Sequence, residues 1–293
     1  MDIIMNQKLL WHLLAVGVVA VWGTTFVNTK ILYNSGLTPS EIFFLRFLIA
    51  YVAIWFISPR KLFANSWRDE GTMLLLGITG GSLFFVAENS AVALTYVNNV
   101  SFITSTSPLV TVILGIVFVK SIKATWTLIV GSLIALVGVG LVIFNGSFIL
   151  HLNPWGDLLA LLTAVCWAVY TLLMKRVSER YSAVFITRKL FFYGLLTVLP
   201  MFLIDPWTVS LATLLTPKVA FNLLLLGLVA SFLCFALWTV VIERLGVMTA
   251  SNYQYLNPIT TVVASAIWLS EPMTAIAYIG SALILIGVIV SNK

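Results

Sequence analysis

The sequence consists mainly of apolar stretches about as long as a membrane-spanning helix, joined by short polar connections. Residues 128–144 stay apolar for a whole helix length and lack the polar alternation of membrane β-strands. Hydrophobic residues make up 61% of the 293 residues and charged residues 9%, whereas soluble proteins have about 45–50% and about 25%. Because no water-soluble fold buries so large an apolar share, we predict an all-α integral membrane protein.

Ten of these stretches are long enough to cross a bilayer, which takes about 20 apolar residues. They lie near residues 10–33, 39–58, 71–94, 97–119, 125–144, 155–175, 183–204, 218–242, 249–269 and 273–291. The connections between them leave no room for a soluble domain. Any functional site must therefore lie among the helices.

The chain also repeats itself. The segment Leu-Leu-Leu-Gly at residues 74–77 recurs at residues 224–227, and Pro108 recurs as Pro258, each 150 positions later. Self-similarity at a fixed separation indicates a duplicated structural unit.

The duplicated units divide the ten spans five and five. We predict a first repeat over residues 1–150 (spans one to five) and a second over residues 151–293 (spans six to ten). Because five is an odd number, the second copy must enter the membrane from the opposite side. Inverted repeats of this kind are typical of secondary carriers, whose substrate site lies near the midplane where the repeats meet.

Basic residues are distributed unevenly between the two sides of the membrane. With the amino terminus inside, the outer connections hold two basic residues, Lys30 and Lys218, and the inner ones hold eleven. The inner set is Lys8, Arg60, Lys61, Arg68, Lys120, Lys123, Lys175, Arg176, Arg180, Arg244 and Lys293. This pattern predicts that both termini are cytoplasmic, and we expect a bacterial cytoplasmic (inner) membrane. The positive charge should contact anionic lipid headgroups, and we expect no nucleic acid partner.

Pro108 and Pro258 each lie about ten residues into the fourth span of their copy. Proline removes a backbone hydrogen bond and interrupts a helix, and paired interruptions in corresponding spans of a carrier indicate a binding site. Polar residues gather beside both prolines: Ser101, Thr104, Ser105 and Ser107 in the first copy, and Asn252, Tyr253, Gln254 and Asn257 in the second. They either line a cavity or only satisfy the carbonyl groups that the break frees.

Ionisable residues inside spans are costly to bury, so each is a functional candidate by default. Arg46 and Glu88 lie at similar depth on adjacent antiparallel spans. They suit a static ion pair or, if Glu88 releases Arg46 and takes a proton, coupling of transport to the proton gradient. Arg188 and Lys189 lie about five residues into the seventh span without an evident acidic partner. We expect these two to snorkel to the inner headgroups.

Two further acids are assigned to helix starts. Glu41 and Asp157 each follow a proline by two or three residues, where an acid suits the positive end of the helix dipole. His12 and His151 differ too much in depth to share a metal ion, and the ten Asp and Glu residues are scattered. We therefore predict no catalytic set, no metal site and no cofactor.

Aromatic and amide side chains form the candidate substrate-binding wall. Trp22 and Thr25 share a face of the first span, and Trp167 and Tyr170 share a face of the sixth. Since the first helices of the two copies should meet near the pseudo-twofold axis, we expect these side chains beside the cavity, although interfacial aromatics are the alternative. The full candidate set is Trp22, Thr25, Asn28, Glu88, Asn89, Trp167, Tyr170, Trp238, Asn252, Tyr253 and Asn257.

Small residues mark one face of the fifth span of each copy. They are Gly131, Ala135 and Gly138 in the first copy, and Gly280 and Gly287 in the second. Such residues allow helix backbones to approach closely. The faces suit either packing within the chain or contact between two copies, so a homodimer is left open.

Several motifs recur in the order and spacing of one known family. They are Val-Trp-Gly-Thr-Thr-Phe at 21–26, Phe-Leu-Arg-Phe at 44–47, Ala-Leu-Thr-Tyr at 93–96 with Ser-Pro at 107–108, Gly-Asp at 156–157 with residues 164–170, and Leu-Ser-Glu-Pro-Met-Thr at 269–274. Together they resemble the ten-helix EamA-type branch of the drug/metabolite transporter superfamily over nearly the whole chain. One departure is Lys120, which stands where the family usually has a glutamate like Glu271. The resemblance implies a carrier of small polar metabolites, often an exporter of amino acids or related compounds.

The sequence therefore favours a secondary transporter that moves a small-molecule solute by alternating access around a midplane cavity. An uptake carrier or a facilitator for another solute class is the alternative. An intramembrane enzyme acting on lipid phosphates would need clustered acids or a catalytic His/Asp set, and a channel would need rings of charge; the sequence has neither pattern. The substrate, the direction of transport, proton coupling and the oligomeric state are left open.

Overall fold

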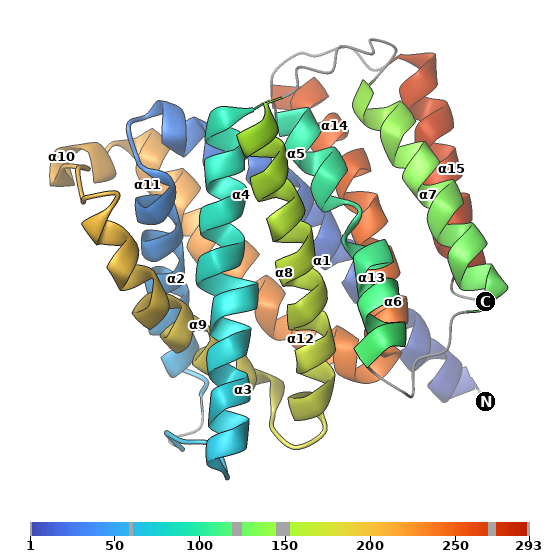
Figure 1. Ribbon diagram of the computed structural model, residues 1–293, viewed down its shortest axis with the longest axis horizontal. Coiled ribbons are helices and arrows are strands. Elements are labelled where there is room, and N and C mark those ends of the chain that lie inside the picture. The colour runs from blue at the N-terminus through green and yellow to red at the C-terminus, as the bar shows by residue number, and fades with distance from the viewer. Residues whose placement is uncertain are drawn as a thin grey trace.

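The computed structural model describes residues 2–58, 61–95, 97–118, 125–144, 153–268 and 274–291. Throughout these ranges the regular elements are helices (Figure 1). In chain order they are α1 (Asp2–Asn34), α2 (Pro39–Trp55), α3 (Trp67–Gly77), α4 (Leu83–Leu94), α5 (Val97–Thr104), α6 (Ser107–Phe118), α7 (Trp126–Phe144), α8 (Pro154–Ser178), α9 (Ala183–Val198), α10 (Leu211–Leu214), α11 (Pro217–Leu224), α12 (Cys234–Leu245), α13 (Val247–Asn252), α14 (Asn257–Trp268) and α15 (Ala275–Ser291). Short π-helical segments (Ile78–Ser82 and Leu225–Leu233) and 3-10 segments (Leu199–Leu203 and Tyr253–Leu256) lie between some of them.

Six continuous helical stretches in these ranges are long and apolar enough to cross a membrane. They are Leu9–Asn34, Trp67–Leu94, Val100–Phe118, Pro154–Ser178, Ala183–Leu203 and Pro217–Leu245, and shorter apolar helices cover Trp126–Val142 and Tyr278–Ser291. The prediction of an all-α membrane protein is confirmed, whereas the count of ten spans stays a prediction.

Some predicted positions lie outside the described residues. They are Arg60, Tyr96, Lys120, Lys123, His151, Glu271, Lys293 and the side chain of Lys8. What was expected of them stays a prediction.

Local sequence explains where two of the helices begin. At the start of α2 the Thr38 hydroxyl accepts from the backbone N–H of Glu41 at 3.3 Å, and the Glu41 carboxylate accepts from the Thr38 N–H at 2.8 Å. This reciprocal pair is a capping box. At the start of α8, Asn153 accepts from a backbone N–H in the first turn, and Asp157 lies in that turn. The helix-start roles predicted for Glu41 and Asp157 are confirmed.

The helix path is interrupted at the two repeated prolines. α5 ends at Thr104, and α6 begins one residue before Pro108; α14 likewise begins one residue before Pro258, after a 3-10 turn. The hydroxyls of Thr104 and Ser105 donate to backbone carbonyls of α5, at 2.8 and 2.6 Å. In the first copy these two polar residues therefore satisfy backbone carbonyl groups in the last turn of the helix.

α7 and α15 pack against each other at the right edge of Figure 1 over a seam of small residues. A Cβ atom added at Gly138 would lie 2.6 Å from the Gly280 carbonyl oxygen, and one added at Gly280 would lie 2.7 Å from the Gly138 oxygen. A Cβ at Gly131 would lie 2.4 Å from the backbone nitrogen of Ser291. Only glycine permits such an approach. The predicted small-residue faces therefore pack within the chain and are not free for contact between copies.

The repeated Leu-Leu-Leu-Gly segments end on a second pair of close contacts. A Cβ at Gly77 would lie 2.4 Å from Cβ of Tyr193 on α9. A Cβ at Gly227 would lie 2.6 Å from Cγ2 of Ile49 on α2. The glycine of each half thus packs on a helix of the other half, which is the relation expected between two duplicated units.

The prediction that Arg188 and Lys189 snorkel to the headgroups is wrong. Lys189 is 4% exposed and forms an ion pair with Glu70, whose carboxylate also accepts from the Tyr193 hydroxyl. The Arg188 guanidinium lies 4.6 Å from the ring centroid of Trp55. The acidic partner comes from the first turn of α3, which counting along the seventh span alone does not reveal.

Candidate functional site

A small cavity of about 40 Å³ lies among helices of both halves of the chain. Its wall is formed by α1, α2, α4, α8, α12 and the break before Pro258. The lining residues are Trp22, Thr25, Phe26, Arg46, Phe84, Phe85, Glu88, Trp167, Phe235, Gln254 and Asn257. A buried water needs about 10–15 Å³, whereas pockets for drug-sized ligands measure about 300–1,000 Å³. The cavity is therefore large enough for water and too small for a drug-sized ligand.

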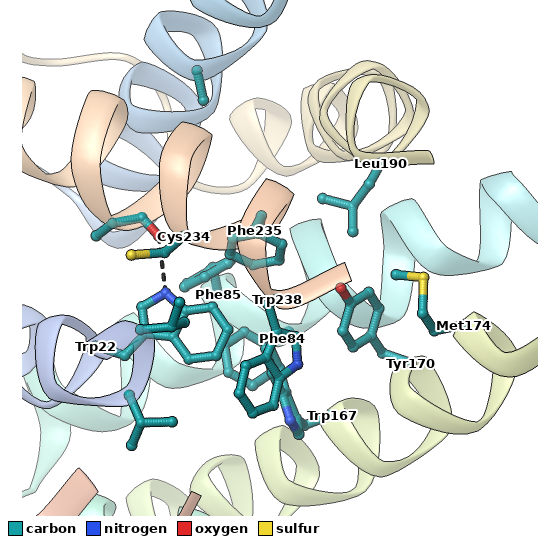
Figure 2. Close-up of a cluster of buried hydrophobic side chains, with 14 of the residues drawn as sticks. Trp22, Phe84, Phe85, Trp167, Tyr170, Met174, Leu190, Cys234, Phe235 and Trp238 are labelled. Carbon is teal, nitrogen blue, oxygen red and sulfur yellow. Dashed lines mark hydrogen bonds between the residues drawn. The ribbon is translucent and has the colours of Figure 1, made fainter. Parts of the chain in front are cut away.

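Aromatic rings from both halves build most of the wall (Figure 2). The Trp22 and Trp167 rings meet edge to face with centroids 5.3 Å apart, and Phe235 lies 5.6 Å from Trp22. The Trp22 indole donates to the backbone oxygen of Ala230 at 2.9 Å, the dashed contact in Figure 2. Ala230 belongs to the π-helical segment Leu225–Leu233, an irregularity that is frequent at functional sites.

Arg46 and Glu88 both lie on this wall, with no direct ion-pair contact between them among the described residues. Arg46 Nε donates to the Ser231 hydroxyl at 2.9 Å, and its guanidinium lies 4.2 Å from the ring centroid of Phe85. Among the described residues Glu88 has no hydrogen bond and no ion pair, although it is only 7% exposed. In this conformation the guanidinium has the Ser231 hydroxyl and the Phe85 ring as its neighbours, and whether the two charges pair during transport stays a prediction.

Two amides reach the cavity from the break before Pro258. Gln254 and Asn257 line it, and the backbone oxygen of Asn257 accepts from the hydroxyls of Thr260 and Thr261 at 2.9 and 3.0 Å. These two hydroxyls satisfy the backbone carbonyl at the break. The Asn257 side chain is therefore not needed for that task, and it faces the cavity. Its Oδ1 and the Nε2 of Gln254 find no hydrogen-bond partner within the described ranges.

Tyr170 and Trp238 were predicted on the wall and lie behind it. The Tyr170 ring centroid is 4.9 Å from that of Trp167, and the Trp238 centroid is 5.0 Å from that of Trp22. Neither side chain is exposed. Both support the two tryptophans that line the cavity (Figure 2).

Four predicted polar residues lie away from this cavity. Asn28 donates to the side-chain oxygen of an asparagine on α11 at 2.6 Å, and Asn89 donates to a backbone carbonyl at the start of α2 at 3.0 Å. The Tyr253 hydroxyl lies 2.6 Å from Nδ1 of His12. Asn252 is buried at the end of α13. The contacts of Asn28, Asn89 and Tyr253 each join one helix to another.

Four lining phenylalanines were not predicted from the sequence: Phe26, Phe84, Phe85 and Phe235. A signal for all four exists. Phe26 follows Trp22 by four residues, Phe84 and Phe85 precede Glu88 by one helical turn, and Phe235 precedes Trp238 by three residues. Residues three or four apart share a helix face, so neighbours of each candidate at this spacing belonged in the predicted set.

The sequence profile of the EamA-like transporter family matches residues 9–144 and again residues 154–293. The chain belongs to the EamA-like transporter family. The resemblance seen in its motifs is confirmed, and the two matched ranges correspond to the duplicated halves. Membership identifies the protein as a multi-pass membrane transporter.

Several relatives match this EamA-like transporter over nearly their whole length. An uncharacterized transporter of Archaeoglobus fulgidus is 29% identical, over 95% of this chain and 96% of the relative. A probable terminal-alkyne amino-acid exporter of Streptantibioticus cattleyicolor is 26% identical, over 98% and 94%. A probable amino-acid metabolite efflux pump of Escherichia coli is 24% identical, over 95% and 93%. A solved crystal structure with 17% identity has a TM-score of 0.74 over 95% of this chain and 94% of its own, a likeness of fold alone.

Proposed function

We propose that the protein is a secondary transporter that exports amino acids or related small polar metabolites across a bacterial cytoplasmic membrane. The observation that carries the proposal is the cavity itself. Helices of both family-matched halves enclose it, and its aromatic wall contains one buried guanidinium and one buried carboxylate. Relatives named as amino-acid exporters support the substrate class and the direction.

The proposed architecture is ten spans in two inverted five-helix repeats, residues 1–150 and 151–293. The exchanged glycine contacts at Gly77 and Gly227 support it, as does the contact between α7 and α15. The excess of basic residues on one side of this topology supports cytoplasmic termini.

The proposed mechanism is alternating access around the cavity. A cavity of about 40 Å³ must widen to admit a solute, and the helix breaks before Pro108 and Pro258 supply places where the helices can bend. Substrate would then enter from the cytoplasm and leave on the outer side.

Different contacts join the two halves at the two ends of the bundle. At the end proposed as cytoplasmic, Glu70 of α3 pairs with Lys189 of α9. At the opposite end, the Glu41 carboxylate at the start of α2 accepts from the backbone N–H groups of Thr208 and Val209, the latter at 2.7 Å. Alternating access requires these two sets of contacts to open in turn.

Counterflow in proteoliposomes tests the proposal. Vesicles containing the purified protein are loaded with one unlabelled solute and diluted into the labelled solute, for a panel of amino acids, sugars and nucleosides. We expect transient accumulation of at least one amino acid. Repeating the assay with and without a pH gradient separates proton exchange from facilitated diffusion, and Glu88→Gln tests whether Glu88 carries any proton dependence. Efflux from amino-acid-loaded cells, compared with uptake, tests direction.

Two tryptophans of α8 provide a matched pair of variants. Trp167→Ala removes a cavity wall, whereas Trp155→Ala removes a side chain that is 72% exposed. We expect Trp167→Ala to reduce counterflow by about tenfold or more, equivalent to about 1.4 kcal/mol of lost interaction, and Trp155→Ala to retain it. Equal losses would remove the cavity as the transport site, and exchange of sugars or nucleosides but no amino acid would overturn the substrate class.

A further inference from the structure

The wall of the central cavity carries buried polar groups that have no partner. Four such atoms are Arg46 Nη1, Trp167 Nε1, Gln254 Nε2 and Asn257 Oδ1, none of which makes a hydrogen bond within the described ranges. The Glu88 carboxylate, on the same wall, is likewise without a hydrogen bond or an ion pair among those residues. Buried polar groups are nearly always paired, so a cluster of exceptions requires an explanation. A ligand that supplies the missing partners explains all five together.

The chemistry of these groups defines the ligand. Arg46, Trp167 and Gln254 offer donors, one of them a full positive charge. Glu88 and Asn257 offer acceptors, and Glu88 can carry a full negative charge. An amide can turn to present either its oxygen or its nitrogen, so the two charged groups fix the polarity of the ligand and the amides adapt to it.

Arg46 and Glu88 are held apart in a way that leaves both available. The Ser231 hydroxyl accepts from Arg46 Nε at 2.9 Å, and the Phe85 ring lies 4.2 Å from the guanidinium carbon. These contacts occupy one edge and one face of the guanidinium, while Nη1 has no hydrogen-bond partner among the residues that the structure describes. Ser231 and Phe85 are therefore positioning residues that keep Arg46 from closing on Glu88.

We infer that the cavity binds a zwitterion, a free α-amino acid whose carboxylate pairs with Arg46 and whose ammonium pairs with Glu88. A neutral solute would leave two opposite charges buried without a direct contact to either. A simple amine would leave Arg46 unpaired, and a simple acid would leave Glu88 unpaired. The rings of Trp22, Phe84 and Phe235 face the remaining space, so the amino-acid side chain that fits best is apolar.

This inference rests on the proposed function, because it names the charged groups of the substrate that the proposed transport site binds. It separates an amino-acid carrier that requires both charges from a carrier of amines, acids or neutral solutes. It also gives Arg46 and Glu88 distinct tasks, which substitution can test independently.

Competition in the counterflow assay tests the inference. The twenty protein amino acids are first compared as competitors, and the strongest is then tested against its methyl ester, which lacks the carboxylate, and its N-acetyl derivative, which lacks the ammonium. We expect each derivative to compete at least about 100-fold more weakly, since a site with buried polar groups strongly rejects analogues that leave them unpaired.

Substitutions of the two charged residues should change the discrimination against different derivatives. Arg46→Gln should remove the discrimination against the methyl ester while keeping that against the N-acetyl derivative, and Glu88→Gln should do the reverse. Arg46→Lys keeps the charge and provides a second variant if Arg46→Gln does not fold. Glu243→Gln alters a carboxylate outside the cavity and should leave both discrimination ratios unchanged. A merely structural role for either residue would lower all rates without this crossed pattern.

The outcomes distinguish the two proposals. If no amino acid competes or exchanges, the proposed function fails and the zwitterion inference fails with it. If amino acids exchange but the ester and the N-acetyl derivative compete equally well, the proposed function stands and the zwitterion inference is overturned. Loss of both discriminations in both variants also overturns it, because the two charges would then not have separate partners.

Discussion

Replacing Gly138 by alanine tests how the seam between α7 and α15 is built. The new Cβ atom would lie 2.6 Å from the Gly280 carbonyl oxygen and 2.7 Å from the backbone nitrogen of Ile284. That is roughly 0.9 Å closer than the about 3.5 Å of ordinary contact. Both neighbours are backbone atoms, so α15 as a whole must shift. Overpacking of this kind typically costs about 1–3 kcal/mol.

Gly140→Ala is the matched control, two residues further along the same helix. Within the part of the chain that the structure describes, its Cβ atom would meet only Cε2 of Phe102, at an ordinary 3.5 Å. Both substitutions gain about 0.5–1 kcal/mol from the helix preference of alanine over glycine, so this gain cancels between them. We expect Gly138→Ala to be less stable than Gly140→Ala by about 1–3 kcal/mol, with Gly140→Ala as stable as the parent protein or more so.

Thermal unfolding in detergent micelles, followed by loss of the monodisperse peak in size-exclusion chromatography, measures the order of stability. The parent, Gly138→Ala and Gly140→Ala should be compared in the same detergent at the same protein concentration. Equal melting temperatures for the two variants would refute the close packing of α7 on α15. A change in apparent size caused by Gly138→Ala alone would instead point to this seam as a contact between copies.

Three further predictions concern contacts between helices. Lys189→Met leaves the Glu70 carboxylate buried without its cation and should lower the free energy of unfolding by about 3–5 kcal/mol. Adding Glu70→Gln should restore part of that stability. Additive losses in a double-mutant cycle would contradict the pairing. Glu41→Ala removes the capping box and two contacts to residues 208 and 209. It should lower the free energy of unfolding by about 1–2 kcal/mol and speed proteolysis of the 204–210 connection. An unchanged rate of cleavage would show that these contacts do not hold the connection in place. Trp22→Phe keeps the aromatic packing but loses the hydrogen bond to the carbonyl of residue 230; stability should fall by about 1 kcal/mol, and an unchanged melting temperature would argue against that bond.

Much of the fold is predictable because depth in a membrane can be counted along the chain. Apolar runs of helix length, the repeat at 150 positions and the family motifs predict an all-α membrane transporter. The candidates Trp22, Thr25, Arg46, Glu88, Trp167 and Asn257 come from the sequence, and all six line the cavity. Glu41 and Asp157 are assigned correctly because capping depends on neighbours a few residues away.

Which residues face one another was decided by tertiary packing. Tyr170 shares a helix face with Trp167 but lies behind it, and Arg46 binds Ser231 rather than the acid at its own depth. Lys189 finds Glu70 on a helix more than a hundred residues away in sequence.

The sequence by itself determined that this is a membrane protein, that it is duplicated and where two of its helices break, because these features follow from composition and local order. The rotation of each helix about its axis and the choice of neighbour follow from how the helices pack. Such contacts join residues far apart in the chain, which counting along a single span cannot reveal. The small central cavity became visible only in three dimensions, together with the atoms Arg46 Nη1, Gln254 Nε2 and Asn257 Oδ1 on its wall that have no hydrogen-bond partner within the described ranges.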